Sequence, residues 1–304
     1  MPSRTIAAPS TILVSHYWSR NIDLTRLRPL RIVGDSGAYS ARVKGVTISN
    51  DDLGEWADRY RNELYWVACL DVAGDQKATR HSWHYLNRNF DLQTVPSIHF
   101  GDSPRELDYY ADHGCDFVGL GGSAGRYMDD GMLMRWLISV FRYARDNHPQ
   151  MRFHGWGMTG RSPARLPFWS VDSSSWASGY RWGRLDLYTP SGRRRNIRMN
   201  GRDVFAPQMR QLLTNEYGVD PADVAYSNSE TLQNVIRVSA LSASARLQWM
   251  RKRHPEPVTP PSWGIMQDRG IDGTGPNLVL VDSSYQNLAV VRDLYREDVP
   301  GWGA

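Results

Sequence analysis

The sequence predicts an α/β fold on a parallel sheet, and we favour a TIM (β/α)8-type barrel. Short strand-like apolar runs alternate with amphipathic helical stretches six or more times before residue 176, which is typical of βα units. Many of these runs end in Asp, His or Gly, as strands do at the catalytic face of such a barrel. No G-x-G-x-x-G follows the first run, which counts against a dinucleotide-binding fold. An open doubly wound sheet remains the alternative.

The first part of the chain supplies most of the expected strands and helices. Ser49 or Asn50 can cap the first helix, and Ser103 followed by Pro104 is a favoured helix start. The expected strands are 11–18, 30–37, 65–71, 95–100, 116–122, 152–158 and 168–174. Helices are expected over about 49–60, over 77–89, from Ser103 onward and over 131–147.

After Asp172 the pattern changes. Residues 181–201 resemble a hairpin that turns at Pro190-Ser191-Gly192, and residues 203–252 are mainly helical in pattern. The proline-rich stretch 254–264 predicts a linker or an extended wrap, and a strand over 277–284 with a final helix closes the chain. We therefore expect one barrel domain over 1–304, with a basic hairpin at 181–201 and a C-terminal helical and closing region at about 203–304.

The composition excludes several classes of protein. Hydrophobic residues make up 41% and charged residues 22% of the chain, enough apolar material for a sizeable core and against wholesale disorder. No apolar run is long enough for a membrane helix, and the N-terminal stretch lacks the apolar region of a signal peptide. The two cysteines, Cys69 and Cys115, exclude a disulfide scaffold and a four-cysteine zinc site. We expect a cytoplasmic protein without a metal.

Basic residues are concentrated in the predicted hairpin. The net charge of +4 is mild, but arginine outnumbers lysine and suits bidentate phosphate contacts. We expect the hairpin arginines to contact nucleic acid, with a solvated hairpin as an equally weighted alternative. These residues are Arg193, Arg194, Arg195 and Arg198.

Three aspartates end apolar runs, namely Asp35, Asp71 and Asp172. Any one of them alone is best explained as a cap of the following helix or as an acceptor for loop amides. Three together on one face of a barrel favour catalysis. Two carboxyl groups across a glycosidic bond can act as a nucleophile and a general acid/base.

Four motifs in order resemble the tRNA-guanine transglycosylase family. They are DSGAYS (35–40), VGLGGSAG (118–125), HGWG (154–157) and SVDSSSW (170–176). The last two are closer to the DNA-modifying branch, the DpdA-type DNA 7-deazaguanine transglycosylases of phages and bacteria. The resemblance covers about residues 11–200 and implies a TIM barrel that exchanges bases.

The resemblance assigns a role to each matching residue. Asp172 would be the nucleophile on the anomeric carbon, and Asp35 the general acid/base. Asp71 would accept hydrogen bonds from the guanine-type base. Among the remaining substrate-binding residues, the amides of Gly121 and Gly122 would face the base, and Tyr39 would stack on it. Ser36 would shape the pocket, and His99 lies near the position of the family's glutamine. His154 would line the pocket, with a core histidine as an equal alternative.

The resemblance also implies the reaction and its partners. Guanine in DNA would be exchanged for a free 7-deazaguanine base, with 7-cyano-7-deazaguanine favoured, after the target base is flipped out. No cofactor is expected, because the zinc ligands of the tRNA branch are missing. The expected compartment is the cytoplasm, that of the bacterial host if a phage encodes the chain, and a homodimer is allowed. The alternatives are the same chemistry on tRNA, a non-catalytic nucleic-acid-binding barrel, and a sugar-specific glycosidase.

Overall fold

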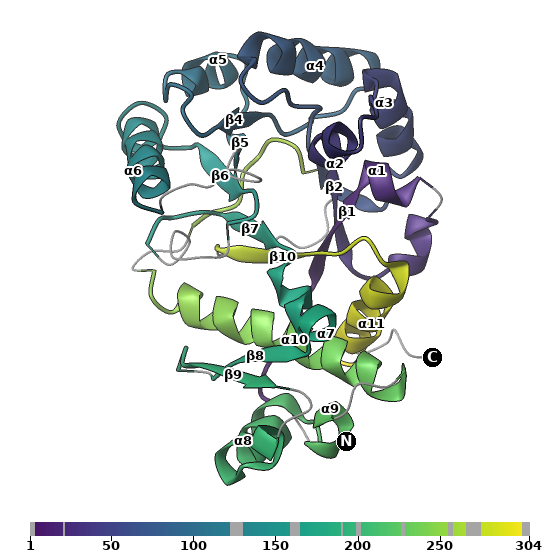
Figure 1. Ribbon diagram of the computed structural model, residues 1–304. Coiled ribbons are helices and arrows are strands. Elements are labelled where there is room, and N and C mark those ends of the chain that lie inside the picture. The colour runs from purple at the N-terminus through teal and green to yellow at the C-terminus, as the bar shows by residue number, and fades with distance from the viewer. Residues whose placement is uncertain are drawn as a thin grey trace.

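The fold is an α/β fold whose eight-stranded parallel sheet curls into a half-barrel (Figure 1). The computed structural model describes residues 4–20, 22–121, 130–158, 165–189, 191–198, 202–225, 229–254, 258–265 and 275–299. The sheet contains β1 (Thr11–Ser15), β2 (Arg31–Asp35), β3 (Leu64–Val67), β4 (Ser97–His99), β5 (Phe117–Gly121), β6 (Arg152–Gly155), β7 (Ser170–Ser173) and β10 (Asn277–Val281).

The order of the strands around the sheet follows the chain, except that β10 lies between β7 and β1. The order is β3-β2-β1-β10-β7-β6-β5-β4, so the late strand over 277–281 completes the sheet begun by the first residues. The strand ladders do not close the sheet between β3 and β4. Across this seam, one parallel bridge joins Ala68 to Val95. The predicted parallel α/β fold is therefore confirmed, as a curled and not fully closed sheet.

Helices surround the outside of the curled sheet (Figure 1). In the first part of the chain they are α1 (His16–Ser19), η1 (Leu24–Leu27), α2 (Ala38–Val43), α3 (Asn50–Arg59), α4 (Gln76–Asn89), α5 (Glu106–Asp112) and α6 (Asp130–Asn147). Later come η3 (Ser175–Ala177), α7 (Ser178–Trp182), η4 (Arg202–Phe205), α8 (Pro207–Leu212), η5 (Leu213–Tyr217), α9 (Ala222–Ala225), α10 (Ser229–Arg251) and α11 (Tyr285–Arg296). Within the described ranges, no helix has both the length and the apolar character needed to cross a membrane.

The two faces of the sheet bury different sets of side chains. Because side chains alternate along a strand, Ile12 and Val14 face the outer helices while Leu13 faces the concave side. The concave side is filled largely by aromatic residues, including Trp66, Phe117 and Trp169. Cys69 and Cys115 are buried among the core residues, as expected of small apolar side chains.

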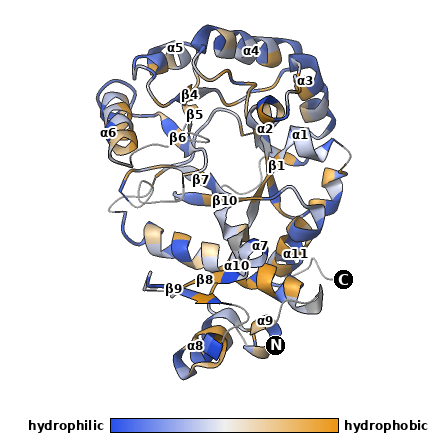
Figure 2. Cartoon of the chain, viewed as in Figure 1, coloured by the Kyte–Doolittle hydropathy of each residue, from blue (hydrophilic) through white to orange (hydrophobic). Residues whose placement is uncertain are grey.

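The chain between β7 and β10 forms an insertion outside the sheet. The predicted hairpin is confirmed as the antiparallel pair β8 (Arg184–Tyr188) and β9 (Arg194–Arg198). Its buried residues Leu185, Leu187 and Ile197 join the core, and Figure 2 shows apolar residues of β8 beside α10. The hairpin therefore exposes one polar face and packs the other against α10.

A strap over residues 258–265 runs between α10 and β10 across the amino ends of the strands. Trp263 donates through Nε1 to the Thr94 carbonyl at 3.0 Å. The Asp116 carboxylate accepts from the backbone amides of Ser262 and Trp263, both at 2.8 Å. Val258 and Trp263 also contact the concave core. For these residues, the extended wrap predicted over 254–264 is confirmed.

Two local expectations were wrong, and one helix was not expected. The first strand ends at Ser15, not at residue 18, because the chain turns into α1 at His16. Helix α2 was not expected. Helix α5 starts at Glu106 and not at Pro104, because the first bonds after Ser103 are three-residue turn bonds, from the Glu106 amide to the Ser103 carbonyl at 3.0 Å and from the Leu107 amide to the Pro104 carbonyl at 3.2 Å.

The strap contacts predict that Asp116→Ala destabilises the fold. Removing the carboxylate leaves two backbone amides without their charged acceptor, at an expected cost of about 1–3 kcal/mol in the free energy of unfolding. Chemical denaturation measures this difference. Asp112→Ala, at the exposed end of α5, is the matched control and should change stability by no more than about 0.5 kcal/mol. Equal effects of the two substitutions would contradict the role given to Asp116.

Candidate active site

The three predicted aspartates come together at the carboxyl ends of the strands. Asp35 is the last residue of β2, Asp71 follows β3, and Asp172 lies on β7. β2 and β7 are separated in the sheet by β1 and β10. The curl nevertheless brings the three carboxyl groups close enough for Asp71 and Asp172 both to act electrostatically on Asp35.

The environment of Asp35 favours the protonated, uncharged form of its carboxyl group. The pKa of this carboxyl is raised from 3.8 to about 7, mainly by removal from water and then by the negative charges of Asp71 and Asp172. The neighbouring Ser15 hydroxyl and the Gly37 amide, which donates to Oδ2 at 3.1 Å, oppose the rise. Near neutral pH, Asp35 can therefore both give and take a proton.

Glycine is needed at position 37 for this geometry. Gly37 has a φ of 77°, and an added Cβ would lie 2.6 Å from the Cβ of Tyr17. The tight turn lets the Gly37 amide point back at the carboxylate and starts α2 immediately afterwards. The glycine of the DSGAYS motif is therefore required by the local backbone structure, in addition to the chemical role predicted for the motif.

Asp172 is bound at only one of its two oxygens. Oδ1 accepts from the Gly157 amide at 2.7 Å and lies 3.2 Å from Nε2 of His154. Across the described chain, no hydrogen bond reaches Oδ2. These two contacts at Oδ1 orient the Asp172 carboxylate.

His154 is a fully buried positioning group for Asp172. Its exposed fraction is 0%, and its ring lies 4.9 Å from the Trp66 ring and 4.3 Å from the Trp156 ring. Nδ1 lies 2.8 Å from the Ser170 hydroxyl. In the neutral imidazole, a proton on Nε2 toward Asp172 leaves Nδ1 as the acceptor for the Ser170 hydroxyl. His154 therefore contacts the candidate nucleophile from the core.

Asp71 and His99 form a second pair at the mouth of the half-barrel. Nε2 of His99 lies 2.6 Å from Oδ2 of Asp71. The backbone amide of His99 donates to Asp102 at 2.6 Å, and Gln76 donates to the same carboxylate at 2.7 Å. This arrangement places the two predicted base-binding residues against each other.

The glycines of β5 make room for Trp156. An added Cβ at Gly119 would lie 2.2 Å from Nε1 of Trp156, and one at Gly121 would lie 3.1 Å from Cδ1 of the same ring. The indole donates to the Ser97 hydroxyl at 3.0 Å, and the Gly121 carbonyl accepts from Phe100 at 2.8 Å. Packing of Trp156 is thus a structural reason for Gly121. Gly122 lies outside the described residues.

Ser36 and Tyr39 occupy different environments beside Asp35. Ser36 is 1% exposed, and its hydroxyl accepts from the Ala38 amide at 3.3 Å. Tyr39 is 48% exposed on α2, with the Arg42 guanidinium 5.7 Å from its ring centroid. Ser36 therefore supports the turn, whereas Tyr39 presents a free aromatic surface.

The hairpin arginines are all exposed on β9 or just before it. Arg194 pairs with Asp186 of β8, with Nε at 3.0 Å and Nη2 at 2.7 Å. Solvent reaches the side chains of Arg193, Arg195 and Arg198. These three residues are better placed than Arg194 to contact a phosphate.

A fourth strand-end aspartate shows the capping arrangement. Asp282 follows β10 and accepts from the Ser284 amide at 2.8 Å and from Asn287 Nδ2 at 3.2 Å, and it also accepts from the Tyr180 hydroxyl. Protein groups therefore occupy both of its oxygens. This use of a strand-end aspartate contrasts with that of Asp172.

Several site residues lie within the motifs but were given no role from the sequence. Ser170 shares the inward face of β7 with Asp172, which the two-residue alternation of a strand could have indicated. Trp156 and Gly157 lie in the HGWG motif, but only their tertiary contacts reveal their partners. Where the chain is described, no group of three or more His, Cys, Asp or Glu side chains could hold a metal ion.

Comparison with known proteins adds no relative: the chain matches no family model, no curated protein and no solved structure. The fold and the site define an α/β protein with a curled parallel sheet and three carboxyl groups at the carboxyl ends of its strands.

The raised pKa of Asp35 predicts a stability difference that depends on pH. Folding favours the protonated carboxyl, so its contribution is complete below about pH 4 and is lost as the pH rises through about 7. Asp35→Asn keeps a neutral side chain. Its free energy of unfolding, relative to that of the wild type, should rise by at most about 4 kcal/mol between pH 4 and pH 8.

Denaturant unfolding of both proteins across this pH range measures the effect. Asp112→Asn removes an exposed carboxylate and should show no comparable change. Parallel stability curves for the wild type and Asp35→Asn would mean that Asp35 titrates as an ordinary solvated aspartate.

Proposed function

We propose that the protein is a glycosyltransferase with a TIM-type barrel that exchanges guanine in DNA for a 7-deazaguanine base, with 7-cyano-7-deazaguanine favoured. The observation that carries the proposal is that Asp35 and Asp172 interact electrostatically although their carboxyl groups have different surroundings. Asp35 has a pKa raised to about 7, whereas Asp172 has one oxygen bound by two N–H groups. The ordered motifs that resemble the transglycosylases support the same assignment.

In the first half-reaction, Oδ2 of Asp172 attacks the anomeric carbon of the sugar. The bond between that carbon and the base nitrogen breaks, and the base takes the electron pair. Protonated Asp35 gives its proton to the leaving guanine, so the base departs neutral. The sugar remains on the enzyme as an ester of Asp172.

In the second half-reaction, the incoming 7-deazaguanine gives a ring proton to the Asp35 carboxylate. Its nitrogen attacks the anomeric carbon, the ester bond breaks, and Asp172 is released as a carboxylate. Asp35 is protonated again, so protons and charge balance over the cycle. No cofactor takes part in these steps.

The hydrogen bonds at Oδ1 suit this chemistry. Gly157 and His154 hold the oxygen that becomes the carbonyl of the ester, so the unbound Oδ2 is the nucleophile. Because His154 is buried and supported by Ser170, the carboxylate is oriented before substrate binds. Asp71, which His99 holds in place, would accept from the guanine-type base.

The nucleic acid would be bound outside the carboxyl ends of the strands, where the three aspartates lie. Exposed Arg193, Arg195 and Arg198 supply phosphate contacts, and exposed Tyr39 supplies a stacking surface beside Asp35. The target guanine would leave the duplex to reach the carboxyl groups. The proposed enzyme acts in the cytoplasm, where DNA and the free base are both present, and a homodimer is compatible with it.

Base exchange should depend on Asp172. Duplex DNA and, separately, tRNA are incubated with labelled 7-cyano-7-deazaguanine, then digested, and the nucleosides are analysed by mass spectrometry. Label should appear in deoxynucleosides. Asp172→Asn removes the nucleophile at nearly constant size and should lower the exchange rate on the order of 10³-fold or more, whereas exposed Asp112→Asn should retain it.

The other outcomes separate the alternatives. Label in tRNA alone would assign the same chemistry to tRNA. Release of guanine without incorporation would indicate a hydrolase that uses the same carboxyl groups with water. Undiminished exchange by Asp172→Asn would refute the assigned nucleophile, and absence of label and of release would leave binding without catalysis.

The first half-reaction should also report the pKa of Asp35. Because the proton donor must be protonated, the single-turnover rate of guanine release should fall as the pH rises through about 7. Asp35→Asn should be slow at all pH values and lose this falling limb. A pH-independent rate in the wild type from pH 5 to pH 9 would show that Asp35 is not the donor.

A further inference from the structure

Two short helices form an exposed, partly aromatic face directly beside Asp35. α2 begins three residues after Asp35, and α1 lies next to it (Figure 1). Trp18 of α1 is 47% exposed, and Tyr39 and Val43 of α2 are 48% and 64% exposed. Tyr39 and Val43 are four residues apart, so they share one face of α2. The Trp18 indole donates through Nε1 to the Ser40 hydroxyl at 3.2 Å, which places Trp18 next to this face.

Contacts to the turn that holds Asp35 fix the orientation of this face. The bond from Trp18 to Ser40 joins α1 to α2. The Tyr17 and Trp18 rings meet edge to face, with 4.8 Å between their centroids. Tyr17 also packs against the turn at Gly37, where an added Cβ would lie 2.6 Å from the Tyr17 Cβ. The aromatic surface is therefore oriented before a ligand binds, which lowers the entropic cost of binding.

Exposed cations border the aromatic face. Arg42 lies on α2 with its guanidinium 5.7 Å from the Tyr39 ring centroid, and Lys44 follows the helix. Both side chains are exposed, and within the described ranges neither forms an ion pair with a carboxylate. Arg20, just after α1, is partly balanced by the charge of Asp52. Arg42 and Lys44 therefore give this face a positive charge.

Exposed aromatic rings beside free cations match the chemistry of a single nucleic-acid strand. The bases of a single strand have open faces that stack on aromatic side chains, and its phosphates are attracted by the cations. In a duplex the faces of the bases are covered by their neighbours in the stack, so only the phosphates could use this surface. Because the face begins beside Asp35, a strand bound on it continues into the candidate active site.

We infer that the α1–α2 face, made up of Trp18, Tyr39, Arg42, Val43 and Lys44, binds unpaired nucleotides next to the target guanine. Trp18, which lies outside every motif, stacks on a neighbouring base, and Arg42 and Lys44 contact the backbone phosphates. The stacking offsets part of the cost of unpairing the DNA beside the target. The protein therefore uses single-stranded or locally opened DNA. The identity of the nucleic acid as DNA rests on the proposed function.

An oligonucleotide without guanine tests this surface separately from base exchange. Fluorescence anisotropy measures the binding of a labelled oligothymidine of about 12 nucleotides and of an A·T duplex of the same length. The wild type should bind the single strand roughly tenfold more tightly than the duplex, and Trp18→Ala should weaken single-strand binding by about tenfold. Trp18→Phe keeps a ring and should stay within about threefold of the wild type. Phe205→Ala removes an exposed aromatic ring from η4 and should leave the affinity unchanged.

A second variant keeps the test valid if Trp18→Ala changes the fold. Val43 is the most exposed apolar residue of the face, so Val43→Glu adds a negative charge there without disturbing the core. It should also weaken single-strand binding by about tenfold, because the added carboxylate repels the phosphates. Leu232→Glu adds the same charge at an exposed position of α10 and is the matched control.

The remaining outcomes separate this surface from the proposed reaction. Equal affinity for the strand and the duplex, or unchanged binding by folded Trp18→Ala and Val43→Glu, would overturn the inference. Binding of oligouridine without binding of oligothymidine would overturn the assignment to DNA in favour of RNA. Trp18-dependent binding of oligothymidine by a protein that exchanges no base would uphold the surface and refute the proposed function.

Discussion

All eight strands of the curled sheet run in the same direction, and this constraint decides where the candidate catalytic groups lie. Parallel strands end at one edge, so polar residues that follow separate strands meet there. Asp35 and Asp172 come from strands with two others between them, yet they interact. The strap, anchored on Asp116, lies at the opposite, amino ends of the strands.

Three carboxyl groups at one mouth would repel one another if they had equal surroundings. The protein separates them by environment. Burial and the charges of its neighbours raise the pKa of Asp35 to about 7. Asp172 is bound by N–H groups from Gly157 and His154, and Asp71 is paired with His99. Carboxyl groups in such different environments are what the proposed pair of a proton donor and a nucleophile requires.

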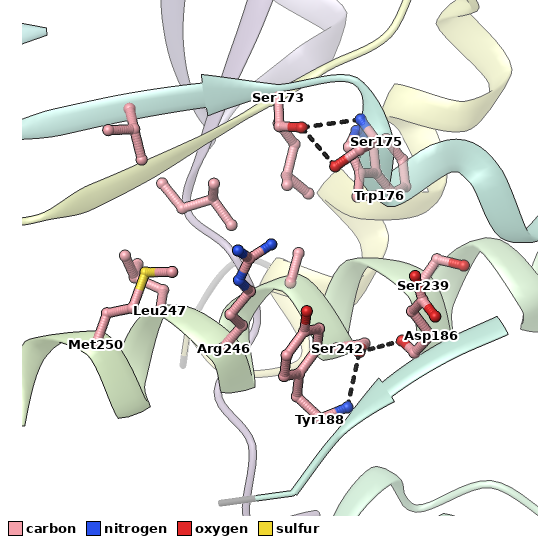
Figure 3. Close-up of a pocket in the computed structure, with 14 residues that line it drawn as sticks. Ser173, Ser175, Trp176, Asp186, Tyr188, Ser239, Ser242, Arg246, Leu247 and Met250 are labelled. Carbon is pink, nitrogen blue, oxygen red and sulfur yellow. Dashed lines mark hydrogen bonds between the residues drawn. The ribbon is translucent and has the colours of Figure 1, made fainter. Parts of the chain in front are cut away.

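The insertion between β7 and β10 covers part of the outer side of the sheet and forms a pocket against it. The hairpin packs on α10 and brings Asp186 and Tyr188 to the helix, while Arg246 reaches toward the strands (Figure 3). The result is a partly polar pocket on the convex face of β7 and β10. A single strand, β7, therefore contributes to the site at the mouth and to the pocket behind it.

The sequence by itself determined the βα alternation, the hairpin and the three strand-end aspartates, because strand and helix periodicities and turn residues are local signals. The pattern of apolar runs alone could not distinguish Asp172 from Asp282, since both follow such runs and only their tertiary partners make Asp282 a cap and leave one oxygen of Asp172 without a described partner. Nor could it show that β10 joins β1, that Trp156 fills the space beside Gly121, or that Asp35 has a raised pKa. Those properties depend on contacts between residues far apart in the chain, which only the folded structure brings together.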